Sequence, residues 1–228
     1  MSDNDVGRLK RGPSGGCMLT SASVREYVER LASGEATPGG GSAAALVGAL
    51  GAALGEMVGN FTRDKDGWDK VAPSLEELAR RHEALLDLTD RDAEAYGSVS
   101  AAYALPRGDE MEKAVRTAAI QVALKQAAQV PLQVIDHVVA TVNELPILLA
   151  HGNSNLVSDV GVAADLCQSA FRCAWLNVEV NLAYLKDEEY KSRVRQEMQD
   201  KIGEAEQTAA SVWEQTIDRI VGDQQSGT

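Results

Sequence analysis

The sequence predicts an all-α protein, folded as a single-domain antiparallel bundle of six or seven helices. Apolar residues recur at helical spacing along most of the chain, and no segment has the alternating pattern of a strand. Hydrophobic residues make up 44% of the 228 residues but aromatic residues only 4%, so the core consists of small and medium side chains. Such side chains suit close contacts between helices.

The first two expected helices flank a glycine-rich turn. Ser23 can cap a short helix that ends at Leu31, and a second helix is expected from about Ala43 to Phe61, after the turn at residues 38–42. Each glycine inside a helix costs about 1 kcal/mol relative to alanine, which favours a close helix crossing, within the subunit or across a dimer interface. The glycines of this helix are Gly48, Gly51, Gly55 and Gly59.

Two capping patterns start the next helices. Ser74 and Glu77 have the spacing of a capping box and predict a helix that runs to about Leu105. Asp109 and Glu112 repeat this pattern with an aspartate cap, and the helix after them continues towards Pro131. Because a proline removes a hydrogen bond from a helix, we expect a kink or a fresh start at Pro131.

Two long helices complete the bundle, from about residue 158 to 185 and from about 187 to 221. We therefore expect the folded domain to span residues 20–222. Residues 1–19 form an N-terminal tail, expected to be flexible because Lys10 and Arg11 stand among glycines, and residues 223–228 form a C-terminal tail.

The charge of the chain excludes several classes of partner. With 22 basic and 34 acidic residues the net charge is −12, which repels phosphate backbones and anionic lipid. No run of basic residues offsets this charge, so we expect no nucleic acid and no membrane as partners. The uncharged stretch at residues 36–55 approaches the length of a membrane span, but its glycines make it too weakly apolar. The N-terminus has no signal pattern, and we expect a cytoplasmic protein.

Cysteines and histidines point to neither disulfides nor a metal. Cys17, Cys167 and Cys173 are odd in number and form no CxxC pair, as is typical of a reducing compartment. The three histidines, His82, His137 and His151, show no metal-ligand spacing.

The glycine-rich turn is the first candidate site. Gly39, Gly40 and Gly41 let a backbone approach a ligand closely, and the helix start after them offers unpaired N–H groups to an anion. Ser42 adds a hydroxyl. The segment is neither a P-loop nor a dinucleotide fingerprint, and a flexible turn that leads into a helix explains it equally well.

Polar residues inside helices are further candidates. Asp92 interrupts an otherwise apolar helix and faces either solvent or a polar cavity. Arg116 lies on the following helix, where charged side chains are usually solvated. Asn177 and Asn181 share one helix face and form either a buried hydrogen-bonding pair or part of a ligand wall.

A second polar loop precedes the helix at about residue 158. It contains Asn153, Asn155, Ser158 and Asp159. Ser158 or Asp159 could cap the helix. Alternatively, Asp159 is a carboxylate held at a helix start among amide donors, a setting suited to general acid or base catalysis.

Taken together, five segments resemble those of the cyclodeaminase/cyclohydrolase family in order and spacing, over roughly residues 20 to 215. They are residues 36–45 with Pro-Gly-Gly-Gly-Ser, residues 92–96, Leu105-Pro-Arg107 followed by Arg116, residues 130–132, and Gly152-Asn-Ser-Asn-Leu-Val-Ser-Asp159. The first and last of these are the most specific.

The resemblance implies an all-α homodimer that binds tetrahydrofolate in a cleft near the subunit interface, without metal or nucleotide cofactor. Asp92 and Asp159 are then the candidate catalytic groups, with Arg116 as the partner of a negative group. The resemblance assigns substrate binding to Pro38, Gly39, Gly40, Gly41, Ser42, Lys65, Asn153, Asn155 and Ser158. Where many relatives have a Gly-Lys-Lys stretch, Asp64 and Asp66 flank Lys65, which weakens a role in gripping a polyglutamate tail.

The resemblance leaves two reactions open. A cyclohydrolase adds water to the methenyl carbon of the folate and opens it to the formyl derivative, whereas a cyclodeaminase closes the formimino group and releases ammonia. We expect methenyltetrahydrofolate hydrolysis, because 228 residues leave no room for the formiminotransferase domain of the bifunctional deaminases. Formiminotetrahydrofolate cyclodeaminase is the alternative, and a non-catalytic folate-binding protein is a further one.

Overall fold

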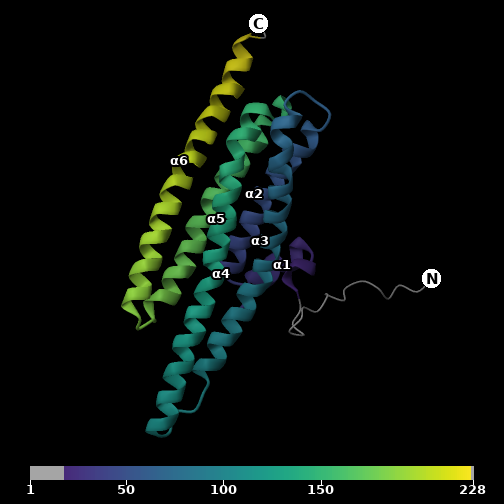
Figure 1. The fold of residues 1–228 in the computed structure, drawn as a ribbon. Helices are drawn as coiled ribbons and strands as arrows, with labels where there is room; N and C mark the ends of the chain where they lie inside the picture. The colour runs from purple at the N-terminus through teal and green to yellow at the C-terminus, as the bar shows by residue number, and fades with distance from the viewer. Residues whose placement is uncertain (1–17, 227–228) are drawn as a thin grey trace, which may run out of the picture.

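The described part of the chain, residues 18–226 of a computed structural model, is an all-α bundle (Figure 1). It contains six α-helices, two short 3-10 helices and no strand, so the predicted fold class is confirmed. The α-helices are α1 (Val24–Leu31), α2 (Gly40–Thr62), α3 (Trp68–Tyr103), α4 (Glu110–His151), α5 (Val157–Ala183) and α6 (Glu188–Ser226). The 3-10 helices are η1 (Leu19–Ser21) and η2 (Ser154–Leu156).

Helix α2 is the centre of the bundle and packs against α3, α4 and α5, while α6 covers α5 and α4. Helices α3 and α4 have 36 and 42 residues against 23 in α2, so the hairpin that they form extends beyond the start of α2 (Figure 1). Helices α2 and α4 are long and apolar enough to cross a membrane by length and composition. Within the bundle, 56% of the most apolar window of α2 and 44% of that of α4 are buried.

The glycines of α2 let the neighbouring helices approach it closely. A Cβ added at Gly48 would lie 2.7 Å from Val138 of α4 and 3.4 Å from Leu85 of α3, and one at Gly55 would lie 3.3 Å from Leu78. At Gly51 it would come within 2.6 Å of the Cys167 sulfur. These helices therefore approach more closely than side chains would allow. The predicted close crossing is confirmed, and these contacts lie within the subunit.

Two predicted helix starts are confirmed by their caps. Ser23 accepts a hydrogen bond from the Glu26 amide and forms a full capping box at α1. Asp109 accepts from the Glu112 amide and caps α4. Side-chain caps of this kind satisfy N–H groups that have no partner inside the helix.

Two helix starts suggested by the sequence beside prolines do not occur. Helix α3 begins at Trp68 rather than Ser74, and Pro73 lies inside it with Ser74 buried. Helix α4 runs without a break from Glu110 to His151 through Pro131, which excludes a fresh start there, while a kink stays a prediction. A proline removes one helical hydrogen bond, but Val130, Pro131 and Leu132 are all buried. Tertiary packing of the apolar face stabilises the helix more than the missing bond destabilises it.

The expected tails fall mainly outside the described residues. Residues 1–17, with Cys17, lie outside them. Leu19 is buried and belongs to the body of the protein, and the helical backbone of α6 continues to Ser226.

Candidate functional site

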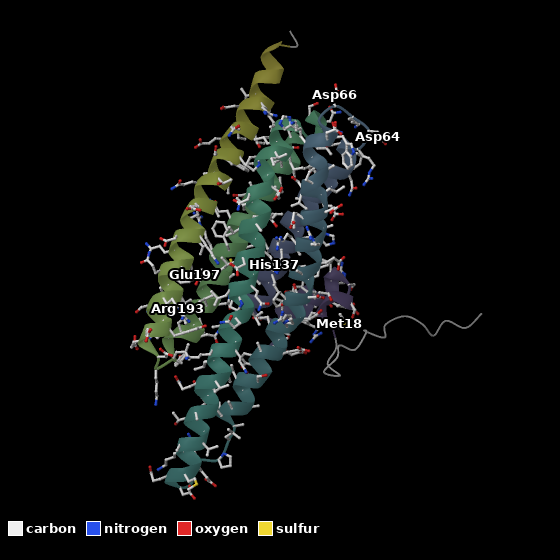
Figure 2. The ribbon with its side chains drawn as sticks, in the orientation of Figure 1. Met18, Asp64, Asp66, His137, Arg193 and Glu197 are labelled. Atoms are coloured by element: carbon white, nitrogen blue, oxygen red, sulfur yellow. The ribbon has the colours of Figure 1, made fainter. Side chains whose placement is uncertain are left out.

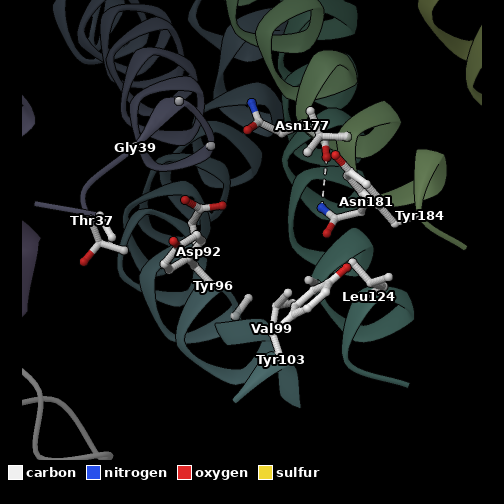
Figure 3. A pocket seen from close by; sticks show the side chains of 16 residues that line it. Thr37, Gly39, Asp92, Tyr96, Val99, Tyr103, Leu124, Asn177, Asn181 and Tyr184 are labelled. Carbon is white, nitrogen blue, oxygen red and sulfur yellow. Dashed lines mark hydrogen bonds between the residues drawn. The ribbon is translucent and has the colours of Figure 1, made fainter. Parts of the chain in front are cut away.

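A pocket of about 600 Å³ opens at the N-terminus of α2. Helices α3, α4 and α5 extend past the start of α2 and enclose the pocket between them. The first turn of α2 forms one of its walls. Figure 3 shows the pocket from close by. It is lined by Ala36, Thr37, Gly39, Gly40, Gly41, Asp92, Ala95, Tyr96, Val99, Tyr103, Leu124, Ala127, Asn177, Val180, Asn181 and Tyr184.

Asp92 occupies a core position of α3. It follows Leu78 and Leu85 at intervals of seven residues, and Val99 follows it at the same interval. Seven residues are close to two helical turns, so these side chains share one face. Leu78 and Leu85 meet glycines of α2 and complete the core, whereas Asp92 meets Gly41 at the pocket. The polar cavity is therefore the correct alternative for Asp92.

The carboxylate of Asp92 is held against the first turn of α2. Its Oδ2 accepts a hydrogen bond of 2.9 Å from the amide of Ser42. A Cβ at Gly41 would lie only 2.1 Å from the Asp92 Oδ1 atom, so this approach needs glycine. Burial raises the pKa of Asp92, and the Ser42 amide partly opposes this effect. The carboxyl group is thus tuned towards proton transfer nearer neutral pH.

Two asparagines and three tyrosines form the other walls. Asn177 and Asn181 of α5 face Asp92 across the pocket (Figure 3). Their amide nitrogens donate to the backbone oxygens of Cys173 and Asn177, each over 2.9 Å. The asparagines therefore line the pocket, although they also bond to their own helix. Tyr96, Tyr103 and Tyr184 add half-exposed aromatic surface.

Three of the predicted residues support the pocket without lining it. Pro38 and Ser42 are buried. Arg116 donates two hydrogen bonds, of 3.1 and 3.0 Å, to the backbone oxygen of Tyr103, and its guanidinium lies over the Tyr103 ring. Its present contacts hold the end of α3 beside the pocket. Among the described residues that line the pocket, Asp92 is the only aspartate, glutamate, lysine or arginine.

The second predicted cluster lies at the other end of α2. The Asn153 amide donates to the Thr62 hydroxyl over 3.0 Å, and its side chain donates to the Phe61 carbonyl. At about 1.5 Å per residue, the 23 residues of α2 separate this cluster from the glycine-rich turn by roughly 33 Å. Within one subunit, the two halves of the predicted site do not meet.

The remaining members of this second cluster surround Asn153. Asn155 donates its amide to the Asn153 side chain, and Ser158 and Asp159 lie in the first turn of α5. Leu156 occupies the cap position without a side-chain bond, so neither Ser158 nor Asp159 is the N-cap of α5. Lys65 is exposed in the loop between α2 and α3. Its neighbours Asp64 and Asp66 stand at one end of the bundle, whereas Met18 lies lower, near α1 (Figure 2).

The pocket tyrosines are the residues that sequence reasoning missed. Tyr96, Val99 and Tyr103 recur at helical spacing on the part of α3 that follows Asp92. This spacing is a usable signal, because two tyrosines continue the face on which the half-buried Asp92 lies. Tyr184, the C-cap residue of α5, follows Asn177 and Asn181 at similar spacing.

The described residues contain no group of three or more histidine, cysteine, aspartate or glutamate side chains that could hold a metal ion. Cys167 is buried, and burial raises the pKa of its thiol to about 12. Cys173 is exposed. Whether the protein works without metal or cofactor stays a prediction.

The chain is similar in sequence to proteins of known activity. Residues 23–200 match the family model described as Formiminotransferase-cyclodeaminase. A methenyltetrahydrofolate cyclohydrolase of Methylorubrum extorquens is 36% identical over 192 residues, which are 82% of this chain and 92% of that protein. A formimidoyltransferase-cyclodeaminase of Rattus norvegicus is 35% identical over 198 residues, and the match covers 85% of this chain but 37% of that protein.

One solved structure has the same fold. The crystal structure of formiminotetrahydrofolate cyclodeaminase from Thermotoga maritima superimposes with a TM-score of 0.72 and is 34% identical. The superposition covers 88% of this chain and 96% of that one.

Proposed function

Because this chain belongs to the formiminotransferase-cyclodeaminase family, we propose that it is a methenyltetrahydrofolate cyclohydrolase. The cyclohydrolase relative supports this reaction, since the similarity extends over 92% of that protein. Within the pocket, Asp92 carries the proposal, because it is the charged group among the described lining residues. The substrate is then a folate of one-carbon metabolism.

The chemistry of the pocket suits this substrate. The methenyl bridge is a cation, and a carboxylate across the pocket attracts it. The half-exposed rings of Tyr96, Tyr103 and Tyr184 offer apolar faces to the flat rings of a folate. The oxygen atoms of Asn177 and Asn181 can accept hydrogen bonds from N–H groups of the ligand.

The proposed reaction uses Asp92 first as a base and then as an acid. Water attacks the methenyl carbon, a C–O bond forms, and the ionised Asp92 takes the proton that the water loses. Asp92 then gives this proton to a folate nitrogen as its bond to the carbon breaks. The hydroxyl proton leaves to solvent, which yields the neutral formyl product and one proton overall. A raised pKa favours both transfers near neutral pH.

Cyclodeaminase activity is the second candidate. The Thermotoga maritima structure, of which 96% is covered, supports it. In this reaction a folate nitrogen attacks the formimino carbon, and ammonia leaves after taking a proton. The tetrahedral carbon again carries two folate nitrogens, so the same carboxyl group can transfer the protons.

We also propose that the protein is a homodimer formed through an apolar face of α2 and α5. Leu50 on α2 is 51% exposed, and Leu176 and Val180 on α5 are 66% and 61% exposed. Helices α2 and α5 pack against each other, and the proposed interface takes in these exposed side chains of both helices. Val180 also lines the pocket. An exposed apolar face of this kind is typical of an interface between subunits.

The two-fold symmetry of such a dimer supports a cleft near the interface. Leu50 is next to the midpoint of α2, and a two-fold axis perpendicular to the helix at this point would pair the helix antiparallel with its copy. The glycine-rich turn of one subunit then approaches the Asn153 and Asp159 end of the other. This pairing unites the two halves of the predicted site, and Asp159, Asn153, Asn155, Ser158 and Lys65 remain proposed site residues on this basis.

The remaining expectations are proposals of the same kind. A reducing, cytoplasmic location suits a chain with Cys173 exposed and no disulfide partner among the described residues. A reaction that needs only proton transfer at a cationic carbon suits an enzyme without metal or nucleotide cofactor.

The purified chain tests the proposed function directly. It is given methenyltetrahydrofolate and, separately, formiminotetrahydrofolate, and loss of the first and ammonia from the second are followed. We expect faster methenyl hydrolysis than in buffer. Ammonia release without such acceleration favours the cyclodeaminase. Folate binding with neither reaction favours the non-catalytic protein.

A further inference from the structure

Helix α1 contacts the rest of the protein mainly through one side chain. Tyr27 is the only buried residue of α1, with 7% of its surface exposed. Its neighbours Val24 and Val28 are 83% and 54% exposed, so the buried Tyr27 side chain supplies most of the hydrophobic contact of this helix.

The Tyr27 hydroxyl reaches the pocket carboxylate through one intermediate residue. It lies 3.0 Å from the Ser42 hydroxyl, and this pair is buried. The amide of the same Ser42 donates to Asp92 over 2.9 Å. Tyr27 is not among the residues that line the pocket. The hydrogen-bonded path from Tyr27 to Asp92 therefore runs through Ser42.

The first turn of α2 depends on these contacts. Gly39 is the cap residue and has no side chain to satisfy the free N–H groups of the helix start. Asp92 accepts one of them, and Gly41 lies directly against its carboxylate. A shift of this turn therefore changes the hydrogen bond and the position of Asp92 together.

A second contact ties the same part of the chain to α3. The Thr20 hydroxyl donates to Asp90 Oδ2 over 2.6 Å, and the Leu19 amide donates to Asp90 Oδ1. Asp90 lies two residues before Asp92. The segment from Leu19 to Tyr27 is thus attached at one end to Asp90 and at the other to Ser42, and both of these residues are near Asp92.

We propose that Tyr27 is a positioning residue, which holds the Asp92 carboxylate in place by fixing Ser42 and the first turn of α2. The inference rests on the proposed function in that it takes Asp92 as the reacting carboxyl group. A tyrosine suits this position, because its ring fills the space under α1 while its hydroxyl satisfies the buried Ser42 hydroxyl.

The Tyr27→Phe variant removes the hydroxyl and keeps the ring. Tyr190→Phe is the matched control, since the Tyr190 hydroxyl accepts a 2.8 Å bond from Gln129 on α4, outside the lining of the pocket. We expect kcat to fall about tenfold in Tyr27→Phe with KM changed less than twofold, because a misplaced acid or base affects the reaction more than binding. Tyr190→Phe should keep both values.

The titration of Asp92 gives a readout that does not depend on activity. The ionisable groups beside this network are Tyr27 and Asp90, together with Tyr96 in the pocket. The Ser42 amide lowers the pKa of Asp92, so a weakened bond should raise the titration midpoint, by about half a pH unit. Carboxyl carbon NMR of the wild type and both variants measures this shift, and the acidic limb of the kcat profile should move with it.

The outcomes separate the inference from the proposed function. A shifted midpoint in Tyr27→Phe alone supports the positioning role, even in a chain that hydrolyses no folate. An unchanged midpoint, or the same shift in Tyr190→Phe, overturns it, even when the wild type is active. Ser42→Ala should give the same phenotype, and the double variant should be no worse than either single one. Additive losses would contradict a shared path through Ser42.

Discussion

Replacing Gly41 by alanine should abolish most of the activity with little loss of stability. A Cβ at this position would lie 2.1 Å from the Asp92 Oδ1 atom, while real Cβ contacts almost never fall below 3.0 Å. The carboxylate must therefore recede by about 0.9 Å, and a misplacement of about 1 Å costs roughly 100-fold in rate. That factor corresponds to about 2.7 kcal/mol of transition-state stabilisation. In stability, alanine gains about 1 kcal/mol over glycine in a helix, which offsets the local repulsion.

The assay compares kcat/KM for methenyl hydrolysis with the melting temperature from circular dichroism. Gly203→Ala in α6 is the control, because a Cβ there meets nothing within 4 Å. We expect the control to keep its rate and to gain about 1 kcal/mol in stability. A Gly41→Ala variant with wild-type kcat/KM would refute the claim that contact with the first turn of α2 sets the position of Asp92.

Three further predictions concern stability and assembly. Burial raises the pKa of Asp92, so the folded state binds its proton more tightly than the unfolded state does, and the ionised form destabilises the fold above that pKa. The melting temperature of Asp92→Asn should therefore be higher than that of the wild type at neutral pH, and the two should be equal in acid. The same difference in melting temperature at both pH values would contradict this prediction. Gly51→Ala should cost about 1–3 kcal/mol in urea unfolding, because its Cβ would lie 2.6 Å from the Cys167 sulfur; unchanged stability would exclude this crossing. Leu176 is 66% exposed on the proposed interface, so Leu176→Glu should convert the dimer into a monomer, as measured by light scattering. A variant that stays dimeric would place the interface elsewhere.

The fold could be predicted from the sequence because local patterns and tertiary packing agree along most of the chain. The caps at Ser23 and Asp109 lie where the residue types predict them. The helix starts that do not occur, at Ser74 and Pro131, lie where local propensity and burial conflict. A long apolar helix in a core tolerates the loss of a single hydrogen bond at a proline. The local sequence around the proline does not show how much surface the helix buries, so it cannot show whether the helix continues.

The candidate site could be predicted only in part. The glycine-rich turn and Asp92 are 50 residues apart, and nothing local relates Gly41 to Asp92. Their link lies in the antiparallel pairing of α2 with α3, where Gly48 meets Leu85 and Gly55 meets Leu78 at the same seven-residue interval. An aspartate that continues a leucine heptad was the available signal. The position of the Asp159 cluster relative to Asp92 could not be predicted, because it depends on the tertiary contact between Asn153 and Thr62 at the far end of α2.

The rate of methenyl hydrolysis by the wild type and by Asp92→Asn tests the central claim, that this reaction takes place at the α2 pocket. The amide keeps the shape of the carboxyl group but cannot act as a base or carry the charge that attracts the methenyl cation. We predict that the wild type accelerates hydrolysis over buffer and that Asp92→Asn loses at least about 100-fold of that rate, as is typical of a lost general base. An Asp92→Asn enzyme that hydrolyses the substrate at the wild-type rate would contradict it.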